Sequence, residues 1–123
     1  MRGAIVVLAL APVLAATAAK ASELNGVWAR GDGQARVRIA PCGSNVCATN
    51  VWVSDPSSGE AVGDRLVMTL AKQPNGSLSG TAFDQKRNLN ISMTVRVSQN
   101  SLNTRGCLVG QMICKDMSWT AVR

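Results

Sequence analysis

Hydrophobic and polar residues alternate along several short segments of this chain. The clearest alternation runs from Leu89 to Val97, where every second residue is apolar and the residues between are polar. Similar patterns cover residues 34–40 and 65–71. A period of two is typical of β-strands with one buried face, because successive side chains point to opposite sides of the sheet.

Turn-forming residues interrupt the chain every eight to twelve residues, and this spacing is typical of all-β domains. Short links between the strands favour antiparallel neighbours. We expect Pro41 to end the second strand, because proline cannot donate to a ladder. Eight strands are expected, at residues 26–30, 34–40, 46–54, 65–71, 77–84, 89–97, 102–107 and 117–122.

Eight antiparallel strands can close into a small barrel or split into two packed layers. A barrel of this size holds its own side chains or one small ligand. A two-layer sandwich also buries one face of each strand, so the alternation fits it almost equally well. The pattern slightly favours the small antiparallel β-barrel, because a closed sheet leaves no exposed edge.

The first 21 residues have the pattern of a secretory signal peptide. A positively charged start precedes an apolar run over residues 4–14, and residues 19–21 match the rule for cleavage sites, with 16–18 as an alternative. We therefore expect a periplasmic protein whose single domain spans residues 22–123. No cysteine lies near the cleavage point, so a lipid anchor is not expected, and no transmembrane segment is expected after cleavage.

Composition and charge exclude several classes of function. The chain has no His, which excludes Ser-His-Asp and Cys-His nucleophile sites. It has no Tyr and one Phe, so an aromatic platform for single-stranded nucleic acid is not expected, and export also argues against nucleic acid. Thirteen Lys and Arg stand against seven Asp and Glu, and removal of Arg2 and Lys20 leaves a net charge of +4.

Part of this positive charge falls on the polar faces of two predicted strands. Arg36 and Arg38 share one face, and Arg96 lies on the polar face of another strand. If these strands were neighbours, the three side chains would form a cationic patch suited to an anionic envelope component. Ordinary solubilising charge is the simpler interpretation.

Four cysteines are predicted to form disulfides, because an exported protein meets an oxidising compartment. The spacings favour the local pairs Cys42–Cys47 and Cys107–Cys114, although loop entropy favours a crossed pairing. Neither pair has the Cys-x2-Cys spacing of a zinc ribbon, so no metal site is expected.

Three carboxylates, Asp55, Glu60 and Asp64, fall close together in one predicted loop region. They are the only candidates for acid–base chemistry, but carboxylates in loops are usually solvated surface groups. Their spacing also lacks the pattern of a calcium-binding loop. We therefore expect no catalytic residues, no cofactor and no enzymatic activity.

Several motifs together resemble an exported bacterial family catalogued as domain of unknown function 2147, whose members have a lipocalin-like β-barrel. Two segments depart from the family pattern: Ala48 replaces a common Gly, and residues 83–86 follow it only loosely. The resemblance implies a barrel and export, and it supplies no catalytic residues. The motifs that carry it are 26–28 (Gly-Val-Trp), 35–43 with Cys47, 55–56, 63–65, 105–107, and Cys114 with 118–120 (Ser-Trp-Thr).

Lipocalin-like barrels often close one end with a Trp on the first strand and an Arg from the last. The resemblance therefore implies that Trp28 and Arg123 could pair in this way through a cation–π contact.

Two hypotheses for the function remain. In the first, the barrel binds a small apolar or amphipathic molecule. In the second, side chains fill the barrel and the outer surface acts as an envelope interaction or stress-protection module. An internal cavity of about 300 Å³ or more would favour the first hypothesis. The predicted lining is Val37, Ile39, Met68, Ile91, Met93 and Val95.

Overall fold

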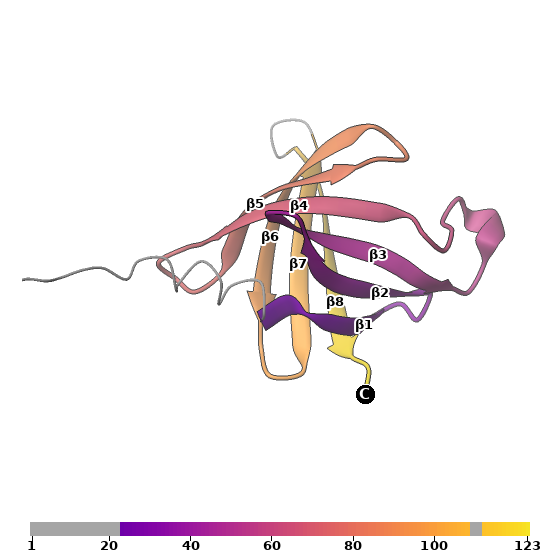
Figure 1. The fold of residues 1–123 in the computed structure, drawn as a ribbon, viewed down its shortest axis with the longest axis horizontal. Helices are drawn as coiled ribbons and strands as arrows, with labels where there is room; N and C mark the ends of the chain where they lie inside the picture. The colour runs from indigo at the N-terminus through magenta and orange to yellow at the C-terminus, as the bar shows by residue number, and fades with distance from the viewer. Residues whose placement is uncertain (1–22, 109–111) are drawn as a thin grey trace, which may run out of the picture.

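The computed structural model describes residues 23–108 and 112–123, which form a closed antiparallel barrel (Figure 1). Each strand pairs with the next one in the chain, and β8 pairs with β1 to close the sheet. This confirms the barrel over the sandwich. The strands are β1 (Gly26–Arg30), β2 (Ala35–Cys42), β3 (Asn45–Val53), β4 (Arg65–Lys72), β5 (Leu78–Asp84), β6 (Leu89–Val97), β7 (Ser101–Leu108) and β8 (Ile113–Ala121).

The predicted signal peptide, residues 1–21, lies outside the described residues. Within the described ranges, no helix has the length and apolar character needed to span a membrane.

The barrel core is built from one face of each strand, as the alternation predicted. Val37 and Ile39 on β2 are buried, while Arg36 and Arg38 between them are exposed. On the neighbouring strands β5 and β6, Leu78 is opposite Val95 in the register, and both are buried. The buried cluster consists of Leu24, Trp28, Val37, Ile39, Met68, Leu78, Ala82, Met93, Val95 and Leu102.

The two ends of the barrel differ in chemistry. A turn at the N-terminal end of the described chain fills one end, where Leu24 has only 1% of its surface exposed. The indole N–H of Trp28 donates to the Leu24 carbonyl oxygen over 2.9 Å, which fixes this turn against β1. The opposite end, which we call the mouth, carries the β1–β2 turn, the β3–β4 loop (residues 54–64) and the β5–β6 turn.

Two strand boundaries differ from the prediction. β2 continues through Pro41, which is opposite Val46 in the register, to Cys42. β1 begins opposite Ile39, so the other edge of β2 has no described partner at Pro41, and proline is tolerated at such an edge. β8 begins at Ile113, four residues before the predicted start. The alternation did not indicate this first part of the strand, because Lys115 occupies an inner position where an apolar residue is expected.

Both disulfides have the predicted local pairing. Cys42 and Cys47 link the ends of the β2–β3 hairpin, with their Cα atoms 5.7 Å apart. Cys107 and Cys114 are directly opposite each other in the β7–β8 ladder, with their Cα atoms 4.0 Å apart. These pairs exclude the crossed connectivity.

Candidate functional site

A cavity of about 260 Å³ lies inside the barrel and opens at the mouth. Its deep part is apolar and draws side chains from six of the barrel strands and from the N-terminal turn. Leu24 forms the floor at the closed end. The apolar lining consists of Leu24, Val37, Ile39, Ala48, Leu66, Met68, Met93, Val95, Leu102 and Trp119.

The rim of this cavity is polar and carries balanced charge. Three basic and three acidic side chains line it, so the rim as a whole is close to neutral at pH 7. The polar lining consists of Arg30, Asn50, Glu60, Asp64, Arg65, Asp84, Arg87 and Thr104.

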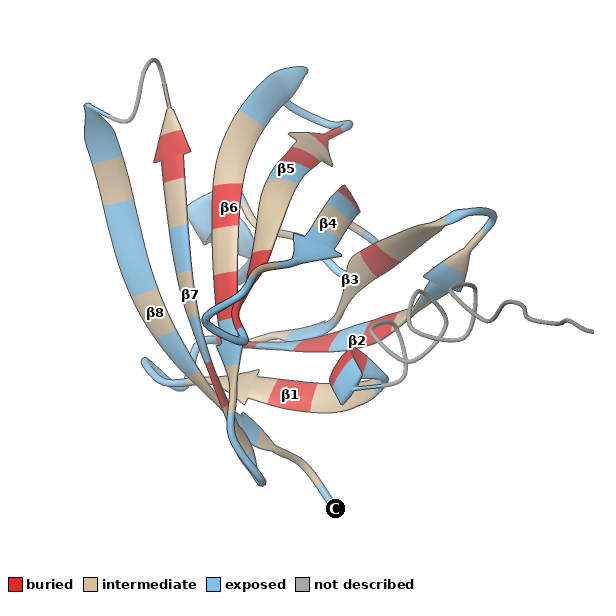
Figure 2. Ribbon diagram, turned by 90° about the vertical axis from the view of Figure 1, so that its left-hand side faces the viewer, coloured by how far each residue is buried: buried red, intermediate tan, exposed pale blue. Residues whose placement is uncertain are grey.

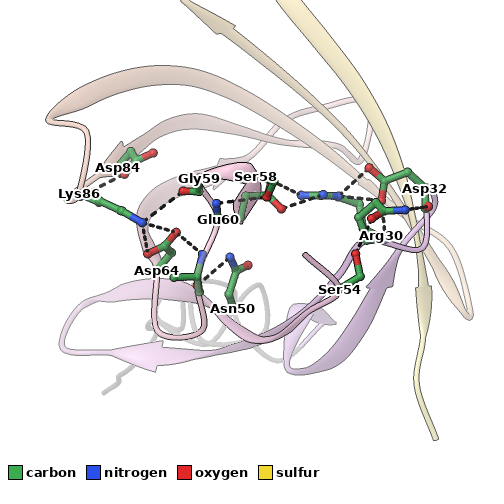
Figure 3. A network of polar contacts seen from close by, with 12 residues as sticks. Arg30, Asp32, Asn50, Ser54, Ser58, Gly59, Glu60, Asp64, Asp84 and Lys86 are labelled. Carbon is green, nitrogen blue, oxygen red and sulfur yellow. Dashed lines mark hydrogen bonds and ion pairs between the residues drawn. The ribbon is translucent and has the colours of Figure 1, made fainter. Parts of the chain in front are cut away.

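Arg30 is the central residue of this rim. It lies at the end of β1, two residues after the buried Trp28, so its side chain points to the barrel interior. Its Nη1 and Nη2 atoms donate to the two carboxylate oxygens of Glu60 over 2.9 and 3.0 Å (Figure 3). Its Nε atom donates to Asp32, also over 2.9 and 3.0 Å.

These contacts favour the ionised forms of Arg30 and Asp32. The hydrogen bond with Glu60 raises the pKa of Arg30 above its ordinary value. The hydrogen bond from Arg30 lowers the pKa of Asp32. A bidentate pair of this kind fixes geometry as well as charge, and it ties β1 to the β3–β4 loop.

A second set of contacts holds the β3–β4 loop on the opposite side of the mouth. Lys86 Nζ donates to the Gly59 carbonyl oxygen over 3.2 Å and to an Asp64 oxygen over 3.3 Å. Arg87 Nη2 donates to the same Gly59 oxygen over 2.8 Å, while its Nη1 contacts Asp84 over 3.1 Å. The loop therefore spans from β1 to the β5–β6 turn and is fastened at both sides (Figure 3).

The β3–β4 loop is also ordered by its own hydrogen bonds. Asp55 caps the short 3₁₀ turn Pro56–Ser58 by accepting from Ser57, which lowers the pKa of Asp55. Burial alone raises the pKa of Asp64, but the Ala61 backbone N–H and the Lys86 ammonium group outweigh this effect and lower it. These hydrogen bonds fix the positions of Asp55 and Asp64 and favour their ionised forms.

Comparison with known proteins places the chain in a family. The profile of a family described as uncharacterized protein conserved in bacteria (DUF2147) matches residues 26–121, which span all eight strands. The chain belongs to the DUF2147 family. No curated protein and no solved structure matches this chain.

The predicted lining residues of this DUF2147 barrel all lie on the inner face. Val37, Ile39, Met68, Met93 and Val95 line the cavity. Ile91 instead lines a neighbouring groove of about 400 Å³ along the inner face of β6, β7 and β8.

The expected pair of Trp28 and Arg123 is not formed. The Arg123 guanidinium group donates to the side-chain oxygen of Asn100, and the Trp28 indole bonds to Leu24. The closed end of the barrel is therefore filled by the N-terminal turn. Arg123 follows the end of β8 and bonds to the adjacent β6–β7 turn, which explains why it does not reach over Trp28.

The expected cationic patch is also absent from the described surface. Arg36 and Arg38 lie on β2, whose neighbours are β1 and β3, whereas Arg96 lies on β6, between β5 and β7. The three side chains therefore face different sides of the barrel. Arg36 instead stacks on Trp52 of β3, with its Cζ atom 5.6 Å from the ring centroid.

The polar rim differs from the expectation for loop carboxylates. The sequence predicts solvated surface groups at Glu60 and Asp64, but they line the cavity mouth and contact Arg30 and Lys86. The sequence does contain one indication of the rim. Arg30 is two residues after Trp28 and four after Gly26, so in a β-strand its side chain lies on the same, inner face. Within the described ranges, no group of three or more His, Cys, Asp or Glu side chains could hold a metal ion.

Proposed function

We propose that this protein is an exported, periplasmic binding protein that holds a small apolar or amphipathic molecule inside its barrel. The observation that carries the proposal is the apolar cavity beneath a charge-paired mouth. Binding sites for small molecules are usually apolar hollows with a few fixed polar groups at one side, and the cavity has this arrangement.

The volume of the cavity sets the size of its occupant. At about 260 Å³ it lies slightly below the range of about 300 to 1,000 Å³ that is usual for ligand pockets. It therefore suits a short aliphatic molecule or one end of a longer one. The cavity is just below the volume of about 300 Å³ expected for a binding barrel, but its open apolar interior supports binding over the second hypothesis, an outer-surface module with a filled barrel.

The lining supports an apolar guest. Met68 and Met93 contribute flexible thioether side chains, which adapt to guests of different shape. The rim carboxylates support binding over catalysis. Asp64 has a lowered pKa, whereas a general acid at neutral pH needs a raised one. Glu60 is occupied by Arg30.

The direct test is native mass spectrometry of the protein purified from its own envelope, followed by thermal unfolding with added sodium octanoate. We expect a co-purifying small molecule and a higher melting temperature with octanoate. An empty protein whose melting temperature is unchanged by octanoate would contradict the proposal.

A matched pair of variants locates the site. Ala48→Leu adds volume to the cavity wall and should abolish the octanoate effect. Ala71→Leu makes the same chemical change at an exposed position on the outer face of β4 and should leave it intact. The melting temperature of each free variant shows whether it is folded.

A further inference from the structure

The inner face of the sheet continues beyond the mouth on one side of the barrel. β1 pairs with β8 only from Trp119 to Ala121, so the segment of β8 from Ile113 to Met117 has no partner from β1. Figure 2 shows β6, β7 and β8 rising well past β1. One wall of the barrel is therefore taller than the rest.

The inner face of this tall wall is an apolar groove of about 400 Å³. Its lining includes Leu89, Ile91, Leu108, Ile113 and Met117. The side chain of Ile113 is 64% exposed and that of Leu89 is 39% exposed, which is unusual for large apolar residues. Contiguous exposed apolar surface of this kind marks a binding surface.

The groove and the barrel cavity are adjacent. They share four lining residues, Arg30, Met93, Thr104 and Trp119. Gly106 lines the groove on the inner face, where a Cβ atom would be 3.1 Å from Cγ2 of Ile91 and 3.6 Å from Cε of Met93. The missing side chain leaves space in the groove beside Met93, which also lines the cavity.

We propose that the ligand is a long-chain amphiphile, with one end of its alkyl or acyl chain in the cavity and the rest along the groove. This inference rests on the function proposed above and names the class of molecule. An extended alkyl chain suits this arrangement because the two apolar volumes, about 260 and 400 Å³, are adjacent and share part of their lining. The polar end of the molecule stays in solvent beyond the groove.

The charged residues of the tall wall favour the alkyl chain of a ligand over a second copy of the protein as the occupant of the groove. Lys115 and Asp116 lie on the open edge of β8, and charged residues at an edge disfavour strand addition from another copy. A folded protein surface could cover the groove but is too large to enter the adjacent cavity of about 260 Å³.

The test compares sodium octanoate with sodium hexadecanoate by calorimetric titration below their critical micelle concentrations. Each additional methylene that is buried should tighten binding about fourfold until the groove is filled. Ile113→Ser should weaken hexadecanoate binding about tenfold and leave octanoate binding unchanged. Val62→Ser is the matched control, because Val62 is exposed to a similar extent, 66%, and lines neither the cavity nor the groove.

The outcomes separate the two proposals. If neither fatty acid binds the wild-type protein, the proposed function fails. If octanoate binds but hexadecanoate binds no more tightly, or Ile113→Ser affects neither ligand, the extended path is wrong and the cavity site stands. If sedimentation shows a dimer that Ile113→Ser dissociates, the groove is an interface between copies and the long-chain assignment is overturned.

Discussion

Arg30 and Glu60 form a bidentate ion pair across the mouth of the barrel, with nitrogen–oxygen distances of 2.9 and 3.0 Å. The pair joins the inward-facing end of β1 to the β3–β4 loop, thirty residues later in the chain. Asp64 and Asp84 are also paired, with Lys86 and Arg87, and the acidic and basic side chains that line the rim are equal in number. The rim thus shapes the entrance without selecting ligands by overall charge.

The first prediction concerns the strength of this pair. In a double-mutant cycle with Arg30→Met and Glu60→Gln, the coupling free energy from urea unfolding should be about 1 kcal/mol, because the pair is bidentate and partly buried. The exposed pair of Arg105 and Asp116 is the control and should give no more than about 0.5 kcal/mol. Equal coupling in the two cycles would contradict a special role for Arg30.

The second prediction concerns pH. Asp32 and Asp64 have lowered pKa values in the folded state, so their stabilising effect is present above the unfolded value of 3.8 and is lost as the pH falls through the lower, folded values. The melting temperature should therefore decline below about pH 4. Asp64→Asn, which keeps an acceptor for the Ala61 N–H, should make this decline shallower. An identical pH profile in the variant would exclude a contribution from Asp64.

The third prediction concerns the disulfides. Each closes a short loop, so replacing either pair with serines should lower the free energy of unfolding by about 2 to 2.5 kcal/mol. Denaturant unfolding of the Cys42→Ser/Cys47→Ser and Cys107→Ser/Cys114→Ser variants measures this directly. Peptide mapping without reductant provides a separate check, since crossed peptides would refute the local pairing.

The fourth prediction concerns a glycine that permits close packing of the sheet. A Cβ atom on Gly80 would lie 1.9 Å from the backbone oxygen of Thr69 on the neighbouring strand, so β4 and β5 would have to separate. Gly80→Ala should cost more than about 2 kcal/mol of stability. Gly106→Ala meets only side-chain atoms, of Ile91 and Met93, at 3.1 Å or more, and its cost should stay near 1 kcal/mol. A similar cost for both would show that the sheet can adjust at Gly80.

The local pattern of the sequence predicted most of the barrel. The alternation from Leu89 to Val97 gave β6 with its observed bounds, because each of its inner residues is apolar. The pattern failed where an inner position is polar or where proline stands at an edge, as at Lys115 and Pro41. The alternation of apolar and polar residues describes each strand separately. The bounds of β2 and β8 also depend on where the neighbouring strands begin and end.

The mouth could not be predicted from the sequence in the same way. Arg30 and Glu60 belong to different elements, and only the closure of the barrel brings them together. The same limit explains the cationic patch, since the distance between Arg36 and Arg96 depends on strand order. Alternation alone does identify the apolar lining, because the pattern within each strand shows which of its residues point to the core.

The methionines allow the central claim to be measured directly. Met68 and Met93 line the cavity, Met117 lines the groove, and Met112 is 83% exposed at the start of the β7–β8 wall. In a protein labelled with ¹³C at the methionine ε-methyl groups, each position gives a separate NMR signal, which single Met→Leu variants assign. On titration with sodium octanoate, the signals of Met68 and Met93 should shift together and saturate, while that of Met112 stays in place. Unchanged signals from both Met68 and Met93 at saturating octanoate would contradict a ligand inside the barrel.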